Sequence, residues 1–205
     1  SLKREEKYAL GVGSLLLDKN PDSALVFVNK ASRELPNSLL LKINLARAYD
    51  AKGETDAALL ACDNILDEHP DQVYVLKMQA GLLDKTGNTD STIQILEKAY
   101  QFAPYDIDLN YSLAYRYAEA KNAKILSLCD SLIRIDTLNH YAEPHYYKGL
   151  FYSNINTNDK ALLMFEQAIQ RNYQYLNAHI EKGRVLYEQK KFAAALKAFT
   201  LANTI

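Results

Sequence analysis

The sequence is poor in the residues and runs that mark several protein classes. It has no tryptophan and only two cysteines, Cys62 and Cys129, in 205 residues. Neither cysteine has a CxxC or CxxH spacing, so they supply no disulfide framework, and we interpret both as small buried apolar side chains. Every apolar run is shorter than the roughly 20 residues of a membrane span, and Ser1 to Glu6 do not resemble a secretory signal.

A basic excess is missing as well. Lysine and arginine number 24 against 25 aspartates and glutamates, which gives a net charge of −1. Nucleic-acid binders usually carry a clear positive excess, because counterion release from phosphates drives much of their affinity. We therefore expect no nucleic-acid partner, and an RNA-reading helical repeat is kept as the weakest of the binding hypotheses.

Three prolines reveal an internal repeat. Pro36, Pro70 and Pro104 follow one another at intervals of 34 residues, and each lies between two apolar helical stretches. Proline ends a helix because it lacks an N–H and restricts the residue before it. A fixed period of this length is typical of stacked repeats. The period divides the chain into units 5–38, 39–72, 73–106, an irregular 107–141, 142–175 and a truncated 176–205.

Small residues recur at fixed places in these units, numbered so that the proline is position 32. Position 20 is occupied by Ala24, Ala58, Thr92, Ala161 and Ala195. Position 8 is occupied by Ala46, Ala80, Ala114, Gly149 and Gly183, and Gly11 falls one place early in the first unit. Both positions belong to apolar stripes of helical period, and a short polar turn separates the stripes. Each unit is therefore predicted to be helix, turn, helix.

With this period and these small residues and prolines, the chain resembles the tetratricopeptide-repeat family from about Glu5 to Ile205. The resemblance implies an all-α fold, a right-handed α-solenoid of stacked antiparallel helix pairs. Two features depart from the family pattern. No unit has a tryptophan at position 4, and the fourth unit fits only if its turn loses one residue, which aligns Ile125 and Cys129 with positions 20 and 24.

In this family the first helices of successive units line a concave groove that receives a partner. The resemblance implies that positions 2, 5, 9 and 12 face the groove, and here they are rich in tyrosine, which suits peptide recognition. One subtype grips a terminal carboxylate with a lysine and an asparagine; Lys77 matches the lysine, but Gly81 replaces the asparagine. The candidate partner-binding residues are Arg47, Tyr74, Lys77, Tyr111, Tyr115, Tyr146, Leu150, Ile180, Arg184 and Tyr187.

Catalysis finds little support in the sequence. There is no glycine-rich phosphate loop and no nucleophile elbow. His140, Glu143 and His145 have the residue types of a metal site. However, His145 and His179 lie one period apart, so both are interpreted as packing residues of the repeat. We expect no enzyme activity, no cofactor and no metal.

The leading hypothesis is a protein-interaction scaffold that binds a peptide or helix of a partner in its groove. The alternative is a structural segment of a larger multi-repeat protein or complex, because the sixth unit has no polar cap. That uncapped unit would continue into further chain or associate with a second copy. The sequence leaves the compartment open between the cytoplasm and a bacterial periplasm or envelope, the latter as a processed lipoprotein.

Overall fold

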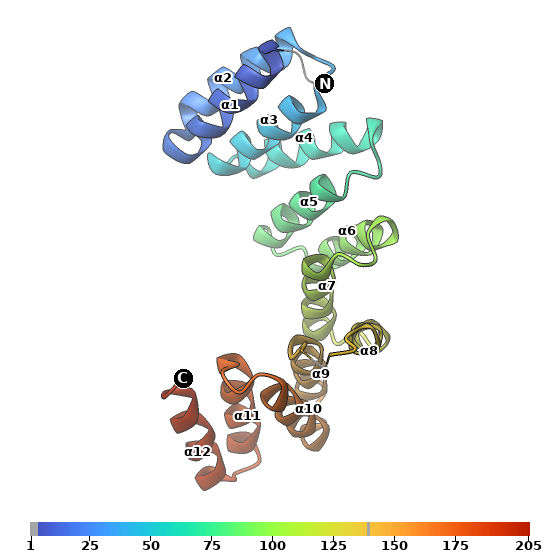
Figure 1. Cartoon of the computed structure of the whole chain (residues 1–205), viewed down its shortest axis with the longest axis vertical. Helices are drawn as coiled ribbons and strands as arrows, with labels where there is room; N and C mark the ends of the chain where they lie inside the picture. The colour runs from blue at the N-terminus through green and yellow to red at the C-terminus, as the bar shows by residue number, and fades with distance from the viewer. Residues whose placement is uncertain (1–3, 139) are drawn as a thin grey trace. The chain divides into compact units, whose positions relative to one another are not determined.

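The computed structural model describes residues 4–138 and 140–205, and these residues form helices with no strand among them (Figure 1). The predicted all-α fold is confirmed. None of the described helices is long and apolar enough to cross a membrane. In chain order the helices are α1 (Arg4–Lys19), α2 (Pro21–Glu34), α3 (Leu39–Ala51), α4 (Thr55–Glu68), α5 (Val73–Lys85), α6 (Thr89–Phe102), α7 (Ile107–Glu119), α8 (Lys124–Ile135), α9 (Glu143–Asn154), α10 (Asn158–Arg171), α11 (Leu176–Glu188) and α12 (Phe192–Ala202).

The helices divide between two compact units. Ser1–Pro104 makes the N-terminal unit, which holds α1 to α6, and Tyr105–Ile205 makes the C-terminal unit, which holds α7 to α12. Within each unit every helix packs against the next one along the chain. The two helices of each pair are joined by a short turn, so they run antiparallel. That the two units form one continuous array stays a prediction.

Glycines and capping side chains build the turns of the N-terminal unit. Gly53 and Gly87 have φ angles of +80° and +76°, in the left-handed region that favours glycine. The side chains of Asn20 and Asn88 each accept the backbone N–H three residues ahead, at 3.0 and 3.2 Å. Pro21 occupies the first turn of α2, where no N–H is needed. The polar stretches seen in the sequence therefore start the second helix of each pair.

The first helix pair departs from the predicted register. The spacing assigned the small residue of this pair to Gly11, but Gly11 is exposed and has open space around it. Gly13 is the residue at the close approach, because a Cβ on it would lie 2.8 Å from Val28 Cγ2. Asn20 alone joins α1 to α2, whereas three residues join α3 to α4. The shorter connection shifts the register of α1, so the assignment to Gly11 was wrong.

In the last two helix pairs of the C-terminal unit, glycine packs against phenylalanine. A Cβ on Gly149 would lie 2.4 Å from the ring of Phe165, and one on Gly183 would lie 2.6 Å from the ring of Phe199. Phe165 is fully buried, whereas Phe199, on the last helix, is 37% exposed. The two glycines let each ring lie directly on the backbone of the first helix in its pair.

Both cysteines are packing residues. Cys62 and Cys129 are free and fully buried, and burial raises the pKa of each thiol to about 12. Both thiols stay protonated at neutral pH, and neither has the lowered pKa of a reactive cysteine. Ile125 and Cys129 have no exposed surface, as expected if one residue is missing from the turn before α8.

Candidate functional site

Residues from three first helices line a pocket of about 540 Å³ in the N-terminal unit. Three of the residues predicted to bind a partner, Arg47 on α3 and Tyr74 and Lys77 on α5, lie together there. Tyr74 is 54% exposed, so its ring is available to a ligand. The remaining lining residues are Leu17, Asp18, Asp50, Ala51 and Met78.

Charges of both signs surround this pocket, and ion pairs balance part of them. Lys85 Nζ lies 2.5 Å from Asp50 Oδ1, so this carboxylate already has a cation. Arg47 Nη1 donates to Asn44 Oδ1 at 3.3 Å, which holds the guanidinium against its own helix. Gly81 has nothing within 4 Å of a Cβ built on it. The asparagine of a carboxylate clamp has no equivalent at that position, as the sequence indicated.

Four tyrosines form a connected cluster in the C-terminal unit: Tyr111 on α7, Tyr146 and Tyr147 on α9, and Tyr175 just before α11. Ring centroids are 5.7 Å apart for Tyr111 and Tyr147, 5.5 Å for Tyr146 and Tyr147, and 5.1 Å for Tyr146 and Tyr175. These are ordinary distances for packed aromatic rings. All four side chains are half-buried, and we call this set the tyrosine cluster.

The tyrosine cluster surrounds a carboxylate. Tyr111 Oη donates to Glu143 Oε2 at 3.3 Å. Burial, and then the charge of Glu143, raises the pKa of Tyr111 above its ordinary value and that of Tyr147 to about 12. Burial, and then Glu181, raises the pKa of Tyr146 to about 12, and burial is also the main cause of the raised pKa of Tyr175. The four phenols therefore stay neutral at physiological pH.

The other predicted residues of the C-terminal unit lie in different surroundings. Tyr115 is 38% and Tyr187 61% exposed, and the ring of Tyr187 packs edge-on against Phe192. Leu150 is half-buried against the core around Phe165, so it has a packing role. The structure leaves Ile180 half-buried on α11, and Arg184 Nη1 lies 2.9 Å from Glu181 Oε1.

The list of candidates drawn from the sequence omitted two members of the tyrosine cluster. Tyr147 follows Tyr146 directly, and Tyr175 precedes the first residue of α11, so neither occupies a groove position of the repeat. Tyr146, in turn, also packs on the ring of Phe165 at 6.0 Å. The unusual density of tyrosine around residues 141–147 was the only sequence signal for this cluster.

Two of the four histidines, His145 and His179, belong to the packing, as the repeat frame predicts. His145 and His179 are 6% and 3% exposed. His145 Nδ1 lies 3.1 Å from Gln167 Oε1, and His179 Nε2 lies 2.8 Å from the carbonyl oxygen of Tyr173. Among residues 4–138 and 140–205, no group of three histidine, cysteine or acidic side chains is arranged to hold a metal ion.

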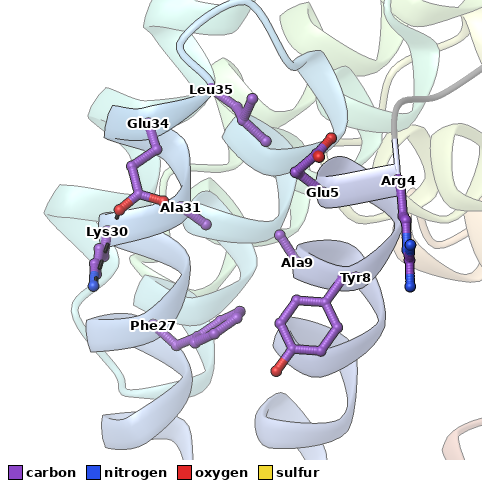
Figure 2. A pocket seen from close by; sticks show the side chains of 9 residues that line it. All are labelled: Arg4, Glu5, Tyr8, Ala9, Phe27, Lys30, Ala31, Glu34 and Leu35. Carbon is purple, nitrogen blue, oxygen red and sulfur yellow. Dashed lines mark ion pairs between the residues drawn. The ribbon is translucent and has the colours of Figure 1, made fainter.

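A larger pocket, of about 720 Å³, lies between α1 and α2 and was not predicted from the sequence. Figure 2 shows the rings of Tyr8 and Phe27 on opposite sides of it, with Ala9, Ala31 and Leu35 farther along. Its rim carries charges of both signs, including Lys30 and Glu34, which lie 4.0 Å apart. This apolar pocket belongs to the first helix pair and contains none of the predicted partner-binding residues.

Known proteins share this fold. A tetratricopeptide-repeat protein from Parabacteroides merdae is 15% identical with a TM-score of 0.84, over 98% of this chain and 80% of that one. YrrB, described as a TPR protein with an unusual peptide-binding site, is 18% identical with a TM-score of 0.63, over 85% and 90%. MamA is 23% identical with a TM-score of 0.63, over 78% and 93%.

Sequence comparison leads to the same family. No curated protein matches the sequence. Two family models described as tetratricopeptide repeat match it, one at residues 15–82 and the other at residues 154–203. Together these matches cover more than half of the chain, and they include helix pairs from both compact units. The chain therefore belongs to the tetratricopeptide-repeat family.

Proposed function

We propose that this chain is a protein-interaction module that binds a peptide or a helix of a partner protein along the first helices of its repeats. One observation carries the proposal: Arg47, Tyr74 and Lys77, chosen by repeat position alone, line one pocket. Large rings beside charged groups are typical of recognition surfaces, where a few aromatic and arginine anchors carry most of the binding energy. YrrB, which has the same fold, is a peptide-binding protein by its description.

The alternative, a structural segment of a larger assembly, is supported by apolar surface at the last helix pair. Phe192 and Leu196 on α12 are 57% and 68% exposed, and Tyr187 on α11 is 61% exposed. Repeats of this kind are stabilised when such faces are covered by a neighbour. Under this alternative a further repeat or a second copy covers α12, and the first helices bind no ligand of their own. We propose no catalytic role under either reading.

The test is selection of peptides from a random display library on the folded chain, followed by affinity measurement with synthetic peptides. We expect Tyr111→Ala, Tyr115→Ala and Tyr146→Ala together to weaken binding about tenfold or more, since aromatic anchors are lost. The matched control replaces three exposed apolar residues of second helices, Val26, Leu60 and Leu163, by alanine.

Tyr146 packs on the buried ring of Phe165, so the triple variant could lose binding because its core is disturbed. A second variant that leaves the core intact is therefore needed. Tyr115→Ala with Tyr187→Ala serves this purpose, because both side chains are exposed. The double variant Arg47→Ala, Lys77→Ala tests whether the pocket of the N-terminal unit contributes to peptide binding. Peptides that bind all of these variants as tightly as the wild type would refute the assignment. A chain that enriches no peptide and has a mass above that of a monomer by light scattering would favour the structural alternative.

A further inference from the structure

Glu143 is a half-buried carboxylate without a cationic partner. It is the first residue of α9, and among the described residues no lysine, arginine or histidine lies within ion-pair distance of it. Neighbouring charges of the unit are paired: Lys148 on the same helix lies 2.6 Å from Asp130, and Arg184 lies 2.9 Å from Glu181. The N-terminus of α9 offsets part of the charge of Glu143, but it supplies no side-chain cation.

The tyrosine cluster adds aromatic faces around that carboxylate. Its rings come from α7, from α9 and from the segment before α11, so three separate elements fix their positions. The hydroxyl of Tyr111 is the only side-chain group that donates to Glu143 among the described residues, and its 3.3 Å distance is long for a bond to a charged acceptor. Much of the capacity of Glu143 to accept hydrogen bonds is therefore still open.

The charge of Glu143 acts on three of the four phenols. Burial is the main cause of the raised pKa of Tyr111, Tyr147 and Tyr175, and the charge of Glu143 raises each of these pKa values further. At Tyr146, Glu181 raises the pKa more strongly than Arg184 lowers it. The phenols themselves remain neutral, so they add no charge of their own and keep the negative faces of their rings.

We propose that Glu143 and the tyrosine cluster bind a cationic side chain, lysine or arginine, of the partner peptide. The carboxylate pairs with the ammonium or guanidinium group, and the rings contribute cation–π attraction, which strengthens as water is displaced. A partner carboxylate is repelled from the same place. This inference rests on the proposed function, since it names the chemistry that the C-terminal unit reads in its partner.

Fluorescence anisotropy with labelled peptides of alternating lysine and glycine tests the inference at physiological salt. Matched probes carry norleucine or glutamate in place of lysine. We expect the lysine peptide to bind about tenfold more tightly than the norleucine peptide, and the glutamate peptide to bind least. Glu143→Gln should weaken the lysine peptide about fivefold and leave the norleucine peptide unchanged.

Three further variants separate the effect of charge at this site from that of net charge, and the effect of the ring from that of the hydroxyl. Glu188→Gln makes the same change in net charge at an exposed residue of α11 that has no hydrogen bond or ion pair among the described residues, and should leave binding of the lysine peptide close to wild type. Tyr147→Phe keeps the ring face and should retain binding, whereas Tyr147→Leu removes the face and should weaken it about threefold. Circular dichroism confirms that each variant is folded.

The outcomes distinguish this inference from the proposed function. If lysine and norleucine peptides bind alike, or if Glu143→Gln and Glu188→Gln act alike, the cation site is refuted. Peptides from the display selection that bind through Tyr115 and Tyr187 without basic residues would refute it too, and would leave the interaction function standing. If neither the lysine peptide nor any selected peptide binds, both proposals fall.

Discussion

Equivalent helix pairs of the two units fill the same space with different side chains. In the second and third pairs of the N-terminal unit the close-packed position of the first helix is an alanine, Ala46 or Ala80, and position 24 of the second helix is a cysteine or a leucine, Cys62 or Leu96. In the last two pairs of the C-terminal unit the same positions hold glycine and phenylalanine. A smaller residue on the first helix thus accompanies a larger one on the second helix.

The surfaces of the two units differ as well. The N-terminal pocket combines Arg47, Lys77 and Asp50, and Asp50 is paired with Lys85. The C-terminal unit presents a half-buried tyrosine cluster beside Glu143, which forms no ion pair with any lysine, arginine or histidine in the described part of the chain. Because both units repeat the same helix pair, the difference indicates that the repeat determines where the side chains of the first helices lie, whereas the individual residues determine their chemistry.

The largest expected change in stability comes from core substitutions in the second helices. Phe165→Ala should lower the free energy of unfolding by about 3–5 kcal/mol, because it removes a fully buried ring and leaves a cavity. Cys62→Ala, at the equivalent position of the N-terminal unit, should cost only about 1 kcal/mol, since it removes one sulfur atom. Urea unfolding monitored by circular dichroism measures both, and hydrogen exchange assigns each loss to its unit. Equal losses would show that the two cores do not divide volume as described.

The second prediction concerns glycine-to-alanine substitutions in the first helices. Their effect on the free energy of unfolding should have opposite signs in the two units. Gly149→Ala should destabilise the chain by about 1–3 kcal/mol, because its Cβ would lie 2.4 Å from the ring of Phe165. Gly81→Ala on α5 should stabilise it by about 0.5–1 kcal/mol, since the new Cβ has free space and alanine favours a helix. Thermal unfolding of both variants is the measurement. Adding Phe165→Leu to Gly149→Ala should recover part of the loss, and a stabilising Gly149→Ala would contradict the close contact.

The smallest effect is a pH dependence specific to the C-terminal unit. Burial, followed by the charge of Arg171, lowers the pKa of His145 below its ordinary value of 6.5. The unfolded chain therefore binds a proton at this histidine at higher pH than the folded chain does. As the pH falls below 6.5 the contribution of His145 to stability should decrease, levelling off below its lowered folded pKa. His145→Gln should remove this component from the difference in urea midpoints between pH 7.5 and pH 5, and an unchanged slope would refute it.

The repeat frame could be predicted from the sequence because its signals are local. Prolines at a fixed spacing end the second helices, asparagines and glycines shape the turns, and small residues mark the places where helices approach each other. His145 and His179 were likewise recognised as packing residues from their spacing of one period, and both are buried. The register of α1 was predicted wrongly, because a single connecting residue, Asn20, replaces a longer turn and the period does not reveal such a change.

The candidate sites could be predicted only in part, because they are formed by contacts between helices that no local sequence pattern reveals. Arg47 and Tyr74 come together in one pocket because consecutive first helices lie near each other, and repeat position was enough to select both. Tyr175 joined the tyrosine cluster from outside a groove position, and Leu150 turned towards the core instead. Repeat position determines the direction of a side chain on its own helix, but the length of the ring and the shape of the neighbouring pair decide what it contacts.

The sequence by itself determined that the chain is a stack of helix pairs, because helix starts, helix ends and small contact residues act over a few residues and repeat at a fixed period. Only the tertiary structure decided that Tyr111, Tyr147 and Tyr175 belong to one cluster beside Glu143, and that no cation within the described residues forms an ion pair with this carboxylate. Tyr111 and Tyr175 lie outside the helix pair that holds Glu143 and Tyr147, so their distances to these two residues exist only once the pairs have packed together.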